Sequence, residues 1–402
     1  MSAHSPHCDR TPTPAPFTRG EYDARLRSVR ERMEAQGLAA LVVTDPANMH
    51  YLTGYDGWSF YTPQCVVVPA DAEPLIFTRG MDAAGARLTT ILDPSRIFGY
   101  PDDYVQRRDT HPMDWIAAEL DRQGLNGGRV GVELDAYYFS ARSHQALQAG
   151  LSKASFTDAE ELVNWVRAVK SEAELAHMRV AARVAERAMT AAVDAIRSGV
   201  RQCDAAAAIS SAQIRGTAEI GGDYPAIVPM LPTGAGTSTP HLTWSDAPFT
   251  SGEATLIELA GCYRRYHCPM ARTVAVGPPA PRLVEVSKIT VAGLEAALAA
   301  VRPGATCEDI EAAWRVEVGR HGLEKPSRMG YAVGLGYPPD WGEHTMSLRP
   351  GDKSVLEPGM TFHLIAGMWL EEGGFEVSEA FVVTEGGAEC LSSFPRELQL
   401  KD

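Results

Sequence analysis

The stretch TLIELAGCYRRYHCPMARTVAVG (residues 255–277) contains two apolar runs joined by a basic turn, which predicts two neighbouring strands. Alternation along the first strand places Glu258 on one face together with Leu256 and Ala260. The returning strand offers Pro269 and Met270, and neither side chain can pair with a carboxylate. Two interpretations of Glu258 stay open: an edge-strand acid that points to solvent, or a desolvated acid in an active site.

The sequence after this stretch continues as strands broken by Gly and Pro. Strand patterns recur in GMTFHLIAGMWL and FEVSEAFVVTE, and helices are predicted over residues 283–301 and 307–321. Alternation places His363 on one face with Ile365, and Glu376 on one face with Ser378. Segregated strands and helices predict an α+β domain in which helices cover one side of an antiparallel sheet.

The first part of the chain has a different pattern. A helix is predicted over residues 19–37, and strand patterns at LAALVVT, CVVVPA, EPLIFT and RVGVEL alternate with helical segments such as HPMDWIAAELDRQG. This alternation is typical of an α/β domain, which we expect to span residues 19–155 after a disordered tail at 1–18. The second domain then covers 156–402 and opens with two capping boxes, TDAE at 157–160 and SEAE at 171–174.

Composition limits the classes of partner. The 402 residues carry a formal net charge of −14, which argues against nucleic acid as a partner because phosphate binding needs clustered Lys and Arg. No apolar run approaches the length of a membrane span, and the first residues lack the apolar segment of a secretory signal. The seven cysteines are scattered and never form CxxC, which fits a reducing compartment, so we expect a cytoplasmic protein.

Two loops carry further candidates. The Gly/Pro/Ser/Thr-rich segment 232–253 contains His241, which is either a solvated loop histidine or a group for proton transfer. The segment NMHYLTGYDGWSFYTPQ (residues 48–64) is dense in aromatic residues, among them Tyr55, Trp58 and Phe60. These rings form either part of a core or an aromatic cage for a small cation.

Taken together, these motifs resemble the pita-bread family of methionine aminopeptidase, aminopeptidase P, prolidase and creatinase. The resemblance runs from about residue 22 to residue 387, and its marks are NMHYLTGYDG, VRAVKSEAELAHMRVAARVAERAM, PHL at 240–242, the 255–277 strand pair, VLEPGM and VVTEGG. It implies a creatinase-like N-terminal α/β domain and a C-terminal domain with a curved antiparallel sheet covered by helices.

The family resemblance also locates the places of its metal ligands. The two Asp, one His and two Glu that hold two metal ions in the metallopeptidases fall here on Glu258, Pro269, Tyr331, Ile365 and Ser378. Pro and Ile cannot coordinate a metal, so the resemblance implies no metal and no other cofactor. Creatinase is the family precedent for hydrolysis without metals, and its catalytic loop histidine falls on His241.

Longer stretches are similar to the ectoine hydrolases, a creatinase-like subfamily that opens the cyclic amidine ring of ectoine. They are LTGYDGWSFY, GGDYPAIVP, PHLTWSD, GCYRRYHCP, GYPPDWGE and TMSLRPGD. The similarity implies ring opening to N-acetyl-L-2,4-diaminobutyrate, with 5-hydroxyectoine as a second candidate substrate, attack by Glu258 to form a covalent intermediate, and His241 as acid/base. Substrate-binding candidates are Tyr55, Trp58, Phe60, Asp223, Tyr224, Tyr331, His363 and Glu376, while Arg272 makes either a structural ion pair or a contact to the substrate carboxylate.

The resemblance extends to partners and leaves alternatives. Creatinase-like members are homodimers, so the N-terminal domain of one subunit is expected to complete the neighbouring active site, and a downstream deacetylase is a candidate partner. The alternatives are a creatinase-like amidinohydrolase, a non-catalytic pita-bread binding module, and a metallopeptidase with displaced ligands at His267, Cys268 and His363.

Overall fold

A computed structural model describes residues 15–402. The chain forms two compact units, one that ends at Val166 and one that runs from Arg167 to Asp402. The disordered tail predicted for residues 1–18 therefore falls mostly outside the described residues. Of its last residues, Phe17 is buried, with its ring against Tyr22 at 6.0 Å and under the guanidinium of Arg25 at 4.0 Å.

The N-terminal unit is built on a mixed sheet with the strand order β4-β3-β2-β1-β5-β6. Its strands are β1 (Ala40–Val43), β2 (Cys65–Pro69), β3 (Leu75–Arg79), β4 (Ile97–Tyr100), β5 (Gly128–Val132) and β6 (Ala154–Asp158). Strands β1, β5 and β6 are parallel neighbours, whereas β2 runs antiparallel to both β1 and β3. This arrangement confirms the α/β prediction for the first domain.

The helices of this unit are α1 (Arg19–Ala35), α2 (Pro46–Thr53), α3 (Ala83–Thr89), α4 (Pro112–Arg122) and α5 (Ala141–Gly150), with short 3₁₀ turns η1 (Pro94–Arg96) and η2 (Asp102–Tyr104), and α6 (Leu162–Arg167) runs across its end at Val166. Helix α2 corrects the interpretation of residues 48–64 as one loop. Asp45 caps it through bonds from the N–H groups of Ala47 and Asn48, and left-handed Gly54 ends it, so the start of the segment, including Tyr51, lies on a buried helix.

The end of this unit differs from the expected boundary near Ser155. Residues 154–158 pair in parallel with β5 and add the edge strand β6, so Thr157 lies in a strand opposite Gly131 rather than at a helix N-terminus. The capping box predicted at Thr157 is therefore wrong. The second one is confirmed, because the Ser171 side chain accepts from the Glu174 N–H and the Glu174 carboxylate from the Ser171 N–H.

The C-terminal unit contains a largely antiparallel sheet with the order β13-β12-β11-β9-β8-β14, to which β7 adds at β8 and β10 at β9. The strands are β7 (Ala254–Tyr263), β8 (Tyr266–Val276), β9 (Gly330–Tyr337), β10 (Asp340–Ser347), β11 (Thr361–Met368), β12 (Phe375–Thr384), β13 (Gly387–Cys390) and β14 (Gln399–Lys401). Strands β7 and β8 confirm the pair predicted from residues 255–277. The hairpin of β9 and β10 was not predicted.

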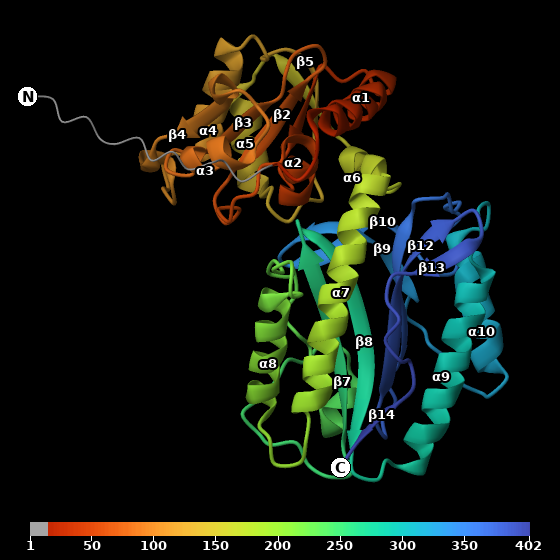
Figure 1. Cartoon of the computed structure of the whole chain (residues 1–402). Coiled ribbons are helices and arrows are strands. Elements are labelled where there is room, and N and C mark those ends of the chain that lie inside the picture. Colours follow the sequence, from red (N-terminus) through yellow and green to blue (C-terminus); the bar gives the residue numbers. More distant parts are fainter. Residues whose placement is uncertain (1–14) are drawn as a thin grey trace, which may run out of the picture. The chain divides into compact units, whose positions relative to one another are not determined.

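Helices α7 (Glu172–Ala195), α8 (Gln202–Arg215), α9 (Pro281–Ala300) and α10 (Cys307–Gly319) accompany this sheet, with the 3₁₀ turn η3 (Gly234–Ser238) before β7. Figure 1 shows α7 lying along β7 and β8, while α9 and α10 run beside the strands that follow. Residues of α7 form one core with Ile257, Leu259, Met270 and Val274. Because side chains alternate across a strand, Glu258 lies on the face of β7 that α7 does not cover.

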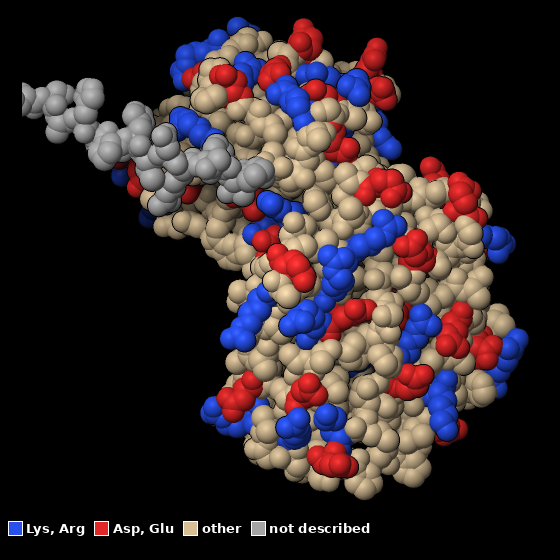
Figure 2. Space-filling view, in the orientation of Figure 1, with Lys and Arg blue, Asp and Glu red and all other residues tan. Residues whose placement is uncertain are grey.

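The surface carries both signs of charge. On the face shown in Figure 2, Lys and Arg side chains are interspersed with Asp and Glu. None of the described helices combines the length and apolar character needed to cross a membrane.

Candidate active site

Glu258 is a buried acid, not an edge-strand acid that points to solvent. It is 8% exposed, with β8 on one side of its strand and residue Met230 bridged to it on the other. Its backbone exchanges both hydrogen bonds with Met230, at 2.8 and 3.1 Å, and two residues later the Ala260 carbonyl accepts from Nε2 of Gln213 at 2.8 Å. Burial, and then the negative charge of Asp340, raise the pKa of Glu258 to about 7.

Glu376 on β12 is the second buried carboxyl of the site. The hydroxyl of Thr273 fixes its backbone, donating to the Glu376 carbonyl at 2.8 Å and accepting from its N–H at 2.9 Å. Its Oε2 is buried and has no hydrogen-bond partner within residues 15–402. Burial and the charge of Glu258 raise the pKa of Glu376 well above its ordinary range. Ionisation of both carboxyls at once is therefore unfavourable, and the positive charge of Lys325 offsets part of this effect at Glu376.

His363 joins this pair from β11. Its Nε2 lies 2.8 Å from Oγ of Ser378, and that hydroxyl accepts from the N–H of Ala271 at 2.7 Å. Burial lowers the pKa of His363 to about 3, so the imidazole is neutral, and its buried Nδ1 has no partner in the described part of the chain. The contact with Ser378 confirms the shared face predicted from strand alternation.

Aromatic rings form another wall. Tyr331 sits opposite His363 in the β9–β11 register, with its ring perpendicular to the imidazole at 5.8 Å, and its hydroxyl accepts from Nε1 of Trp341 at 2.9 Å. Burial and the charge of Glu258 raise the pKa of Tyr331, so the phenol keeps its proton. Asp340, beside Trp341, pairs with His344 at 3.1 Å.

The other predicted residues lie elsewhere. Asp223 accepts from the N–H of Arg265 at 3.3 Å, and the guanidinium of Arg265 covers the Tyr224 ring at 3.5 Å, so both contact the turn between β7 and β8. The His241 side chain is exposed. Its neighbour Leu242 accepts from the N–H of Leu231, which attaches this loop to the segment bridged to Glu258.

The aromatic residues of the N-terminal unit divide into two groups. Tyr55 is 3% exposed and its hydroxyl donates to Gln64 at 3.1 Å, so it belongs to the core of that unit. Trp58 is 58% exposed, and its ring lies 5.1 Å from that of Phe60. The core interpretation therefore holds for Tyr55, while Trp58 is exposed and packs on Phe60.

Sequence reasoning missed several polar groups of the site. Asp340 and Trp341 lie on the unpredicted strand β10, and Lys325 and Arg328 lie on the segment between α10 and β9. The signal available was the dense GYPPDWGE motif, which contributed to the family resemblance but indicated neither a hairpin nor the direction of its side chains. The two cations lie in a segment that was predicted as a connection. Such a segment has no periodic pattern from which the direction of a side chain could be predicted.

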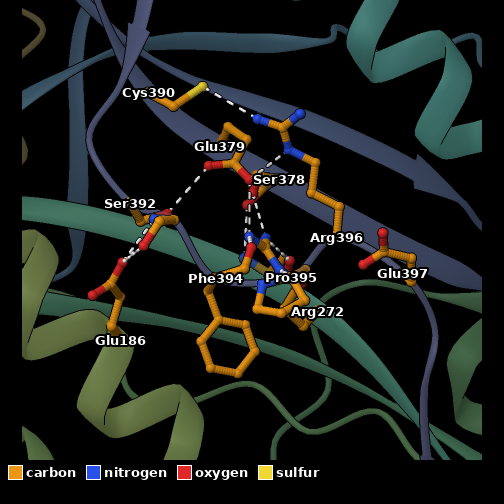
Figure 3. Close-up of polar contacts among 12 residues, drawn as sticks. Glu186, Arg272, Ser378, Glu379, Cys390, Ser392, Phe394, Pro395, Arg396 and Glu397 are labelled. Carbon is orange, nitrogen blue, oxygen red and sulfur yellow. Dashed lines mark hydrogen bonds and ion pairs between the residues drawn. The ribbon is translucent and has the colours of Figure 1, made fainter.

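Arg272 resolves the alternatives left by the sequence in favour of a structural ion pair. Figure 3 shows its fully buried guanidinium against Glu379, with Nη2 and Oε1 separated by 2.8 Å. Its remaining N–H groups donate to carbonyl oxygens of Ala271, Ser378, Phe394 and Pro395. Oε1 of Glu379 also accepts from Nε of Arg396 at 3.0 Å, and Oε2 accepts from the Ser392 hydroxyl at 3.2 Å.

Comparison with known proteins assigns the chain to a family. The profile of metallopeptidase family M24 matches residues 176–385, and that of the Creatinase/Prolidase N-terminal domain matches residues 25–169. The chain belongs to the M24 family. A protein named ectoine hydrolase from Halomonas elongata is 47% identical over 393 residues, covering 96% of this chain and 98% of that protein. An uncharacterized hydrolase/peptidase from Sinorhizobium fredii is 46% identical over 96% of this chain and 99% of its own length.

Solved structures share the fold of this M24 protein. A prolidase from Thermococcus sibiricus superposes with a TM-score of 0.82 at 18% identity, covering 94% of this chain and 99% of that one. The predicted fold, a creatinase-like N-terminal domain followed by a pita-bread domain with its curved antiparallel sheet, is thereby confirmed. The prediction of a hydrolase is also confirmed, by the similarity to the named ectoine hydrolase.

The M24 name implies a metal centre, and the residues at its place do not fit one. Strand register brings the five ligand places together, with Ile365 opposite Ser378 and Pro269 next to the strand of Glu258. Proline and isoleucine offer no donor atom. Within residues 15–402, no group of three or more His, Cys, Asp or Glu could hold a metal ion. Of the displaced ligands considered, His267 has both ring nitrogens engaged, by the Ala226 N–H and the Arg265 carbonyl.

Proposed function

We propose that this protein hydrolyses the cyclic amidine ring of ectoine to N-acetyl-L-2,4-diaminobutyrate, without a metal, and that it acts in ectoine breakdown. The observation that carries the proposal is the buried pair of carboxyls, Glu258 and Glu376, in which Oε2 of Glu376 has no hydrogen-bond partner among the described residues. A desolvated carboxyl pair is costly to a fold unless a cation joins it. The similarity to a named ectoine hydrolase supports the choice of cation.

The chemistry of the substrate matches this pair. Ectoine carries an amidinium in its ring, whose two N–H groups point outward on either side of the methyl-bearing carbon, and each can donate a charge-assisted hydrogen bond to a carboxylate. Binding of that cation favours the ionised form of Glu258 and so lowers the raised pKa of this carboxyl in the complex. Glu258 thereby becomes a carboxylate beside the electrophilic amidine carbon.

The proposed reaction has two stages. A Glu258 oxygen bonds to the amidine carbon, and one ring C–N bond breaks with its electron pair leaving on nitrogen, which takes up a proton. Water then supplies the oxygen that remains on the acetyl group and releases Glu258 as a carboxylate. One water is consumed overall, and the amidine becomes an amide and an amine. His241 is proposed to protonate the leaving nitrogen and to activate the water.

Two further proposals concern assembly and place. We expect a cytoplasmic homodimer in which Trp58 and Phe60 of one subunit complete the neighbouring active site, and a deacetylase is a candidate downstream partner. Light scattering combined with an activity assay tests the homodimer. A fully active monomer would show that Trp58 and Phe60 do not complete the active site of a neighbouring subunit.

The experiment that tests the function is an assay on the purified protein. Incubation with ectoine is expected to produce the acetyl methyl signal of acetylated diaminobutyrate in the proton NMR spectrum, with and without prior dialysis against a chelator. Creatine and 5-hydroxyectoine are assayed in parallel. Turnover of creatine alone would favour the amidinohydrolase alternative, and turnover of none would favour a binding module. Activity that requires stoichiometric metal would contradict the metal-free mechanism.

A further inference from the structure

The segment between α10 and β9 carries two cations, Lys325 and Arg328, beside the carboxyl site. Its end is rigidly placed, because the N–H of Met329 donates to the Leu348 carbonyl at 2.7 Å and the Met329 carbonyl accepts from the N–H of Ile365 at 2.6 Å. Ile365 occupies one of the former ligand places. Arg328 therefore projects from a backbone position fixed against the strands that build the site.

Arg328 is held by groups that do not neutralise it. Its guanidinium lies over the Tyr331 ring at 4.4 Å, and Nη1 donates to the Ser347 hydroxyl at 3.1 Å. Among residues 15–402 the contacts of this guanidinium include no ion pair with a carboxylate, and the residue is exposed. Two uncharged contacts fix its position while its positive charge remains available to an anion.

Lys325 stands on the Glu376 side of the same segment. Its Nζ donates to the Ser327 hydroxyl at 2.7 Å and the Arg328 carbonyl at 2.6 Å, and lies 5.1 Å from the Trp369 ring centroid. Its charge and that of Glu376 stabilise each other. The indole N–H of Trp369 is buried and has no acceptor among the described residues. A donor without an acceptor thus lies beside the lysine.

The site is therefore polarised. The charge of Lys325 already faces that of Glu376, whereas Arg328 lies against the neutral ring of Tyr331, which in turn contacts the ring of His363. A ligand that carries only a cation would leave the Arg328 charge without a partner. A ligand with an amidinium at one end and a carboxylate at the other would satisfy both.

We propose that Arg328, oriented by Tyr331 and Ser347, binds the carboxylate of the substrate and selects zwitterionic amidines over simple cationic ones. Lys325 acts as a positioning residue, because its hydrogen bond to the Arg328 carbonyl fixes the segment in place. Its positive charge adds to the attraction for a carboxylate. This inference rests on the proposed function and adds the group that recognises the second charge of the substrate. Loss of such a charge-assisted contact typically weakens binding about 10- to 100-fold.

The test compares ectoine with the same ring lacking its carboxylate, 2-methyl-1,4,5,6-tetrahydropyrimidine. Arg328→Ala is expected to lower kcat/KM for ectoine about 10- to 100-fold, mainly through KM, and to leave the carboxylate-free ring within about twofold. Arg328→Lys should recover part of the loss. The exposed Arg349, changed to Ala, is the matched control and should change neither value. Equal losses on both rings, or no loss on ectoine, would overturn the proposal.

A binding measurement separates this inference from the proposed function. If the wild-type protein opens neither ring, the proposed function fails, and equilibrium binding of the two rings by thermal shift decides on the subsite. Selective weakening of ectoine binding in Arg328→Ala would uphold it. Equal affinity of the wild type for both rings, or binding of neither, would show it to be wrong.

Discussion

The two faces of strands β8 and β12 hold buried charge in opposite ways. On one face, all five N–H groups of Arg272 have acceptors and Glu379 receives bonds from two arginines and a serine. On the other face, one residue away along β12, Ser378 bonds His363 while Glu376 and His363 each keep a buried atom without a partner in the described residues. The contrast separates a structural polar network from one that a ligand must complete.

Burial alone would not have made this distinction, because Arg272, Glu379, His363 and Glu376 are all at most 1% exposed. The difference lies in how completely each group is satisfied. A saturated network contributes to folding, whereas an unsaturated one costs stability and persists where function requires it.

The largest expected effect is on catalysis. Glu258→Gln keeps the size of the side chain and removes the proposed nucleophile, so kcat for ectoine should fall at least about 10³-fold while the protein stays folded. Glu389→Gln, on the half-exposed acid that pairs with Arg179, is the control and should keep full activity. Near-normal turnover by Glu258→Gln would contradict the covalent mechanism.

Breaking the saturated face should act on folding instead. Arg272→Ala leaves Glu379 buried with less compensation and several carbonyls without donors, so the free energy of unfolding should fall by about 3–5 kcal/mol. Urea titration measures this loss. The half-buried Arg396, which also contacts Glu379, provides the matched variant Arg396→Ala, for which a clearly smaller loss is expected. Equal losses in the two variants would mean that burial does not determine how much Arg272 contributes to the free energy of unfolding.

The pH dependence of stability should report the unsaturated face. The pKa of Glu258 is raised in the folded protein, so its proton stabilises the fold at low pH and this contribution is lost as pH rises through about 7. The Glu258→Gln variant lacks this titration. The difference in free energy of unfolding between the variant and the wild type should therefore shift in favour of the variant by up to about 3 kcal/mol from about pH 5 to pH 8.5. Urea titrations at both pH values measure it, and a pH-independent difference would show that Glu258 ionises freely in the fold.

His241 lies on neither face, because its side chain is exposed on the loop attached beside Glu258. If it transfers protons, His241→Asn should lower kcat about 10²-fold and change the pH–rate profile, with little effect on stability. Wild-type kinetics in this variant would confine the chemistry to the buried carboxyls.

Much of the fold and part of the site could be predicted from residue patterns. Period-2 alternation placed His363 and Glu376 on the face that the structure brings to Glu258, because pleating determines which way a side chain points. The same reasoning could not place Arg328, which lies in a connection between α10 and β9. It could not place Asp340 either, because that residue lies in a hairpin whose strand register is shifted. It also grouped Tyr55 with Trp58. In the structure Tyr55, which directly follows the buried helix capped by Asp45, is 3% exposed, whereas Trp58 is 58% exposed.

Pro269 shows how the sheet accommodates a changed ligand place. The backbone of Glu258 bonds to Met230 rather than to β8, and the Ala260 carbonyl likewise turns away to Gln213. Pro269, opposite Ala260, thus occupies a non-hydrogen-bonded position of the β7–β8 ladder, where no partner on β7 needs its missing N–H. The hydrogen bonds between β7 and β8 are therefore the same whether an aspartate or a proline occupies this position. In evolutionary terms, a metal ligand can be lost at this position without a folding defect that selection would oppose.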